Sequence, residues 1–96
     1  MKGTFAVLWS LRADLHPGRL EVMKDRLELR ARGRTLAIPI VSVVRCSIER
    51  GPSARIRGLA VLRLELADGT VVRIASLESI TVLNDLAGFL AAPVPA

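Results

Sequence analysis

The feature that most constrains the fold is a long run of period-two alternation that ends in one segment with helical spacing. Nearly everything before residue 76 alternates apolar and polar side chains over short segments, as strands with one buried face do. From Ile80 onward, apolar residues recur every three or four positions, which is typical of an amphipathic helix. Because few folds combine such a body of strands with a single closing helix, we predict a mainly β domain with one C-terminal helix.

The alternation predicts seven strands, separated by turn residues. They are expected at residues 5–12, 20–22, 27–31, 36–40, 43–48, 59–67 and 72–74. Turns are predicted at His16-Pro17-Gly18, Lys24-Asp25, Arg32-Gly33-Arg34 and Asp68-Gly69, with a longer loop over residues 50–58. Pro39 cannot donate a ladder hydrogen bond, so it predicts an edge, or a corner where the chain passes to a second sheet.

The last segment has a beginning and an end that suit a helix. Ser76 can accept a hydrogen bond from a free N–H, and Glu78 suits the positive end of the helix dipole. The predicted inward face consists of Ile80, Leu83, Ala87 and Leu90, with Val82 and Phe89 beside it. We expect one domain over residues 1–96, with a core over about 4–92. Because Pro93 and Pro95 prevent continuation of the helix, we expect residues 93–96 to form a frayed tail.

The composition limits the chemistry that the chain can carry. Of its 96 residues, 51% are apolar but only 3% are aromatic, so the core must consist of Val, Leu, Ile and Ala. Cys46 is the only cysteine, which excludes an internal disulfide and a multi-cysteine metal site and fits a reducing cytoplasm. The sequence has no apolar run of about 18–20 residues and no sustained signal-peptide pattern, so we expect a cytoplasmic protein. We also expect no cofactor.

The order of these elements resembles the pleckstrin-homology-like fold, and in particular small bacterial pleckstrin-homology-like and GRAM-like domains. The residues that carry the resemblance are Gly18-Arg19-Leu20-Glu21-Val22 leading to Asp25-Arg26-Leu27-Glu28-Leu29, then Ile38-Pro39-Ile40 with Val43, and Asp68-Gly69 before the helix. The resemblance implies a bent seven-stranded antiparallel barrel closed by the helix. It also implies binding or scaffolding work, on proteins or lipid headgroups, and generally no catalysis.

No arrangement of side chains predicts an active site. His16 is the only histidine and stands in a predicted turn, with no nucleophile-elbow sequence elsewhere. Cys46 is predicted to face inward as a small core residue. Glu21 with Glu28, and Glu65 with Asp68, stand among arginines, where surface ion pairs account for them. We therefore expect no catalytic residue, no metal site and no enzyme activity.

Basic residues concentrate in the first part of the chain. Residues 1–58 hold twelve Lys or Arg against five Asp or Glu, a charge of +7, and residues 59–96 hold two against four, a charge of −2. An anionic partner and a simple solubilising coat both explain this excess. Many lipid-binding relatives carry a lysine followed, after a gap, by two basic residues one position apart, and Lys24, Arg30 and Arg32 match that spacing. The candidates for anion binding are Lys24, Arg26, Arg30, Arg32 and Arg34.

Nucleic acid is a different class of anionic partner. Arg30, Arg32 and Arg34 could neutralise two or three phosphates. Binders of single strands add aromatic stacking platforms, and the aromatic residues Phe5, Trp9 and Phe89 all occupy predicted core positions. This argues against nucleic acid.

Several predicted strands are apolar on both faces, which gives more apolar residues than one small barrel can enclose. The excess predicts an interface, and its candidate residues are Leu8, Val43, Leu59, Val61 and Val71. Scattered apolar residues on a monomer would also explain it. We expect a non-catalytic module that acts through protein–protein contact, with self-association in first place. The alternative is a peripheral binder of anionic membranes or phospholipid headgroups through the basic strand face.

Overall fold

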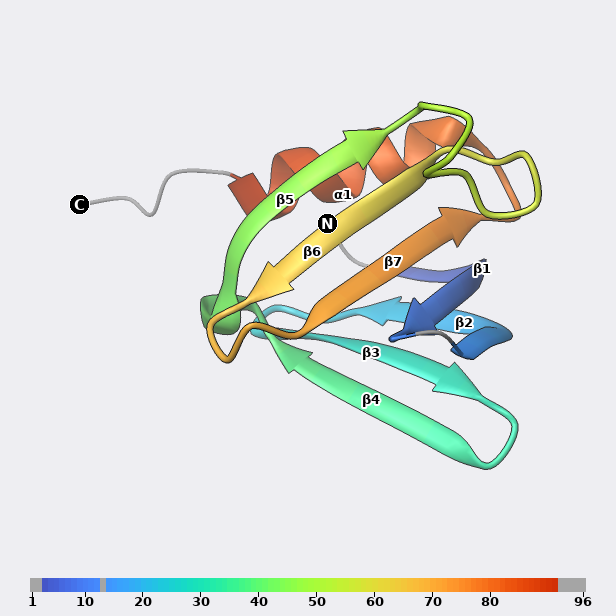
Figure 1. Cartoon of the computed structure of the whole chain (residues 1–96). Coiled ribbons are helices and arrows are strands. Elements are labelled where there is room, and N and C mark those ends of the chain that lie inside the picture. The colour runs from blue at the N-terminus through green and yellow to red at the C-terminus, as the bar shows by residue number, and fades with distance from the viewer. Residues whose placement is uncertain (1–2, 13, 92–96) are drawn as a thin grey trace.

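The computed structural model describes residues 3–12 and 14–91, and it has one antiparallel sheet and one α-helix. The strands are β1 (Gly3–Leu11), β2 (Asp14–Val22), β3 (Arg26–Ala31), β4 (Arg34–Pro39), β5 (Val43–Glu49), β6 (Val61–Leu66) and β7 (Val71–Ser76). Their order in the sheet is β4-β3-β2-β1-β7-β6-β5. The sheet curls into a half-barrel, and helix α1 (Ile80–Ala91) packs against β5, β6 and β7 (Figure 1). This confirms the predicted fold class.

The prediction of a turn at His16-Pro17-Gly18 is wrong, because all three residues lie inside β2. Strand β2 pairs with β1 along its whole length, whereas its pairing with β3 begins only at Gly18. Pro17 therefore stands in an edge segment, where a sheet tolerates proline. The chain turns earlier, just after β1, where Arg12 has a left-handed backbone with φ of 61°.

Gly18 is required by close packing and not by a turn. A Cβ atom at this position would stand 1.7 Å from the backbone oxygen of Arg30. The same oxygen accepts a hydrogen bond from the indole Nε1 of Trp9 at 3.3 Å, so a side chain of β1 is tied to the backbone of β3. Only a residue without Cβ leaves room for that oxygen at this place.

Pro39 marks a corner, as its sequence context predicted. It is the last residue of β4, and the 3₁₀ turn Ile40–Ser42 then leads the chain to β5 at the far end of the sheet. The amide of Ile40 donates to the backbone oxygen of Asp25 at 3.0 Å, which fixes the corner against the β2–β3 turn. A turn lies at Asp68-Gly69 as predicted, with φ of 88° at Gly69. Asp68 is not among the positive-φ residues, so the turn is not the type I′ turn that this pair suggests, which needs positive φ at both centres.

Helix α1 begins where the sequence indicated, but its buried face differs in part. The Oγ of Ser76 accepts from the amides of Glu78 and Ser79, both at 3.1 Å. Leu83 and Leu86 are the fully buried helix residues, whereas Ile80 is 39% exposed because it stands in the first turn, at the rim of the sheet. Leu86 was missing from the predicted face. The prolines predicted to end the helix and the tail at 93–96 lie outside the described residues.

The apolar residues form two buried clusters on opposite faces of the sheet. The larger cluster fills the half-barrel and includes Trp9, Leu20 and the buried helix leucines. The smaller consists of Leu8, Val61 and Ala75, against which Ile56 and Leu59 pack. These last two belong to the β5–β6 loop, residues 50–60, which covers part of the outer face of the sheet. The chain thus buries much of its own apolar excess.

Candidate anion-binding site

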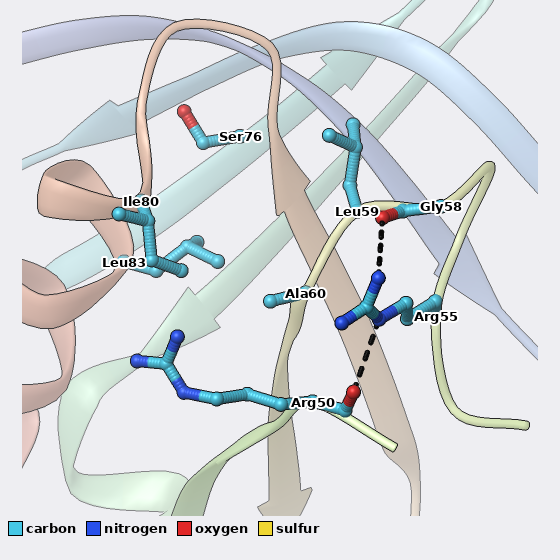
Figure 2. A pocket seen from close by; sticks show the side chains of 8 residues that line it. All are labelled: Arg50, Arg55, Gly58, Leu59, Ala60, Ser76, Ile80 and Leu83. Carbon is cyan, nitrogen blue, oxygen red and sulfur yellow. Dashed lines mark hydrogen bonds between the residues drawn. The ribbon is translucent and has the colours of Figure 1, made fainter. Parts of the chain in front are cut away.

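The β5–β6 loop is held by bonds within itself. Ile56 and Leu59 exchange backbone hydrogen bonds of 3.1 and 2.9 Å around Arg57 and Gly58. Both central residues have positive φ, 50° and 79°, which defines a type I′ turn. The guanidinium of Arg55 donates from Nε to the oxygen of Arg50 at 3.0 Å and from Nη1 to that of Gly58 at 3.4 Å (Figure 2).

This loop brings together arginines from distant parts of the sequence. A surface hollow of about 340 Å³ lies between the loop, the end of β1 and the middle of β7. We call the four arginines that line it the arginine patch: Arg12, Arg55, Arg57 and Arg73. Ser10, Ser53 and Leu15 also line it. Among residues 3–12 and 14–91, no carboxylate lies within ion-pair distance of these guanidinium groups. The hollow therefore carries an uncompensated positive charge.

A second, smaller hollow of about 210 Å³ lies on the other side of Arg55, between the loop and the first turn of α1. Its walls are mostly apolar and come from Leu59, Ala60, Ile80 and Leu83. Figure 2 shows the Arg50 side chain extending toward Leu83 at the edge of this hollow. Arg55 lines both hollows, so the loop presents positive charge on two sides.

The basic strand face predicted from the sequence is present on β3, but its charges are paired. Glu28 accepts from Arg26 Nε at 2.9 Å and from Arg30 Nη2 at 2.7 Å. Asp25 pairs with Arg26 at 3.2 Å, and Glu21 with Arg30 at the same distance. Hydrogen bonds from Arg30, and then from Arg26, lower the pKa of Glu28 below its ordinary value. These ion pairs argue against Arg26 and Arg30 as an anion site.

The other three predicted anion-binding residues are exposed but do not meet. Lys24 lies in the turn before β3, whereas Arg32 and Arg34 lie at the turn after it. Strand β3 has six residues, so its ends are about 20 Å apart. The spacing of Lys24, Arg30 and Arg32 that matches lipid-binding relatives therefore does not form one site.

The predicted interface residues divide into two groups. Leu8 and Val61 are only 3% and 0% exposed, so their prediction as exposed interface residues is wrong: the loop covers them. Leu59 is part of that cover, and Val43 packs against the main core. Val71 is half-buried. The most exposed large apolar residues are instead Val41 at 93% and Val44 at 64%. Val41 lies in the 3₁₀ turn at the corner, and Val44 is the second residue of β5.

Neither of the two residues weighed for catalysis lies in an arrangement that supports it. His16 faces inward on β2, where its ring centroid stands 4.7 Å from that of Trp9. Cys46 is partly buried against α1, and burial raises the pKa of its thiol, which opposes thiolate formation. Among the described residues, no group of three His, Cys, Asp or Glu side chains is placed to hold a metal ion. No helix in that part of the chain is long and apolar enough to cross a membrane.

Sequence reasoning missed the arginine patch because its members are spread over more than sixty positions. Alternation places Arg73 on the outer face of its strand, but it does not predict where a long loop will lie. One local signal was present, in the turn at Arg57-Gly58 of an arginine-rich loop. This turn needs positive φ at both central residues, and the first of them is usually Asn, Asp or Gly, whereas this chain has an arginine there.

The comparisons with known proteins support the fold and say nothing of function. No family model matches the chain, and no curated protein is significantly similar to it. One solved structure that it resembles is the C-terminal domain of an unknown protein from Leishmania infantum, with a TM-score of 0.71 and 12% sequence identity. The match covers 92% of this chain and 81% of that one. At this identity the likeness establishes only a shared fold.

Proposed function

We propose that this protein is a non-catalytic module, of the pleckstrin-homology-like kind, that binds anionic membrane surfaces through the arginine patch. One observation carries the proposal: four arginine residues line one hollow and, within the described chain, their guanidinium groups have no carboxylate in ion-pair range. Each basic residue near an anionic leaflet contributes about 1 kcal/mol of binding. The proposal carries with it a location in the cytoplasm, peripheral to the inner face of the membrane.

Two features favour a membrane over nucleic acid as the anionic partner. Leu15, at the rim of the patch, is 36% exposed, and apolar side chains beside basic ones suit the interface of a bilayer. The aromatic residues offer no stacking platform, because Trp9 is fully buried and Phe5 and Phe89 pack against the core.

Co-sedimentation with vesicles tests the proposal. We expect binding to phosphatidylcholine vesicles to rise when phosphatidylglycerol is added. The variant Arg12→Gln with Arg73→Gln should bind roughly 30-fold more weakly, because two arginines leave the surface contact. Arg32→Gln with Arg34→Gln is the matched control, since it removes the same charge from an exposed turn. Equal losses in both variants, or no binding of the native protein to anionic vesicles, would overturn the proposal.

Self-association is a second candidate function, and the exposure of Val41 and Val44 favours it. Val41 lies in the 3₁₀ turn just before β5, and Val44 is the second residue of β5, which is an end strand of the sheet. Exposed apolar residues beside a free strand edge favour contact with another chain. Light scattering at micromolar concentration should give the mass of a dimer, and Val41→Lys with Val44→Lys should reduce it to that of one subunit. A monomer mass for the native protein would exclude this candidate at that concentration.

A further inference from the structure

We infer that the arginine patch is a built site for a single phosphate group with two negative charges, namely a phosphate monoester or a pyrophosphate. This inference rests on the proposed function, because it specifies which anion the patch selects. The chemistry could be supplied by a lipid headgroup or by a soluble phosphate compound. Four features of the residues that line the hollow support such a site.

Arginines from three separate elements converge on the hollow. They come from the β1–β2 turn, the β5–β6 loop and strand β7, and the hydroxyl-bearing residues Ser10 and Ser53 also line it. Guanidinium groups bind phosphate oxygens through paired N–H donors, and hydroxyls add further hydrogen bonds. If the arginines formed only a diffuse basic coat, arginines from three separate elements would not be expected to line one hollow.

The charge of the patch also favours a ligand with two negative charges. Four positive side chains around one hollow repel each other, and a ligand with a single negative charge would leave most of that repulsion in place. One carboxylate that shares a hollow with a patch residue is that of Asp68, which lines a neighbouring hollow together with Arg12. Hydrogen bonding with Thr70 lowers the pKa of Asp68, first through the Thr70 side chain and then through the Thr70 backbone amide, which donates to Oδ1 at 2.9 Å. The Asp68 carboxylate therefore stabilises the turn between β6 and β7 and does not neutralise the arginine patch.

The β5–β6 loop is held in place without a ligand. Two N–H groups of Arg55 donate to carbonyl oxygens of its own loop, at 3.0 and 3.4 Å. Since a guanidinium has five donors, three remain for a ligand. A side chain that is already fixed loses less conformational entropy on binding, which favours recognition of one group over diffuse attraction.

Two arginines of the patch have a strained backbone. Arg12 and Arg57 are the positive-φ residues other than glycine in the described chain, and both belong to the patch. Left-handed backbone is unfavourable for a residue with a long side chain, and such strain gathers at functional sites. Asparagine or glycine would suit both positions better, so the presence of arginine there points to a use for its charge.

The experiment separates this inference from the proposed function. Vesicles of phosphatidylcholine are prepared with either phosphatidic acid, a phosphate monoester, or phosphatidylglycerol, a diester, at matched surface charge. Inorganic pyrophosphate is titrated separately, at constant ionic strength, while backbone amides are followed by NMR, with sulfate as the reference anion. The variants are Arg57→Asn, which keeps a residue suited to the turn, and Arg34→Asn as an exposed control.

We expect phosphatidic acid vesicles to bind at least about tenfold more tightly, which is the value of one well-placed charged hydrogen bond. Pyrophosphate should shift amides of the β5–β6 loop more than sulfate does, and Arg57→Asn should remove both preferences while Arg34→Asn keeps them. Equal binding to the two lipids, with no pyrophosphate shift beyond that of sulfate, would overturn the inference and leave the proposed function standing. A pyrophosphate shift without any vesicle binding would support the inference with a soluble ligand and overturn the proposed function.

Discussion

Two arginine-rich regions of this molecule differ in one respect, the supply of carboxylates. On β3, Glu28 stands between Arg26 and Arg30 on the same face of the strand, so one acidic residue accepts from two arginines. The members of the arginine patch come from three separate segments, and no strand alternation places an acid among them. The comparison teaches that the number of arginines in a region does not predict free charge. What decides it is whether the local repeat also supplies an acid.

Supplying acids to the patch should abolish the difference between the two regions. Ser10→Glu with Ser53→Glu places carboxylates at the hollow, and we expect affinity for anionic vesicles to fall roughly 30-fold, or about 2 kcal/mol. Co-sedimentation measures the loss, and circular dichroism checks that the fold is kept. Thr35→Glu with Ser47→Glu makes the same charge change at exposed positions outside the hollow. If this control lost as much affinity, net charge and not the patch would control binding.

Removing acids from the paired face should give the opposite result. Glu21→Gln with Glu28→Gln frees Arg30 from its two carboxylate partners and leaves Arg26 with Asp25 alone, so a second basic surface becomes available. We expect affinity for phosphatidylglycerol vesicles to rise at least about fivefold, the contribution of one arginine near the surface. An unchanged affinity would show that free charge on β3 cannot reach the membrane when the patch is bound.

The patch should also be the less stable of the two regions. Arg57→Asn relieves a left-handed arginine in a type I′ turn, and we expect a gain of about 1 kcal/mol in the free energy of unfolding. Urea denaturation measures the gain. Arg32→Asn is the control in a turn where Gly33 carries the positive φ, so it should gain nothing comparable. A loss of stability in Arg57→Asn would mean that the arginine makes contacts that outweigh its strain.

The smallest expected effect is on the stability of the fold at acidic pH. Because Arg30 and Arg26 lower the pKa of Glu28 below its ordinary value of 4.5, the folded state holds this carboxylate charged more strongly than the unfolded chain does. Its stabilising contribution is complete above pH 4.5 and disappears as the pH falls through the lower folded value. Urea denaturation at several acidic pH values should give a flatter profile for Glu28→Gln, whereas Arg12→Gln in the patch should keep the native slope. Parallel profiles for Glu28→Gln and the native protein would contradict this ion-pair account.

The sequence predicted those parts of the molecule that depend on local pattern. Alternation identified the strands, Pro39 identified the corner, and Asp68-Gly69 identified a tight turn. The His16-Pro17-Gly18 prediction failed because its turn residues serve other purposes: Pro17 lies at an edge, and Gly18 allows close packing. Proline and glycine have the same local appearance in both settings, and only the tertiary contacts distinguish them.

The candidate site depended on contacts that no local pattern contains. Alternation correctly indicated that Leu8 and Val61 point away from the main core, but it could not show that the β5–β6 loop would fold over them. The same long-range contact carries Arg55 and Arg57 to Arg12 and thereby creates the patch. The missed cover and the missed site thus have one cause, the path of a loop whose position depends on residues far away in the sequence.

The shared oxygen of Arg30 has a consequence for how this chain can change over time. Because it receives the Trp9 indole and also occupies the place of a Cβ at residue 18, the two positions cannot vary independently. A smaller residue at position 9 would leave the oxygen without its donor, and any larger residue at position 18 would displace it. Descendants of this sequence should therefore keep or lose the tryptophan and the glycine together, as a linked pair on neighbouring strands.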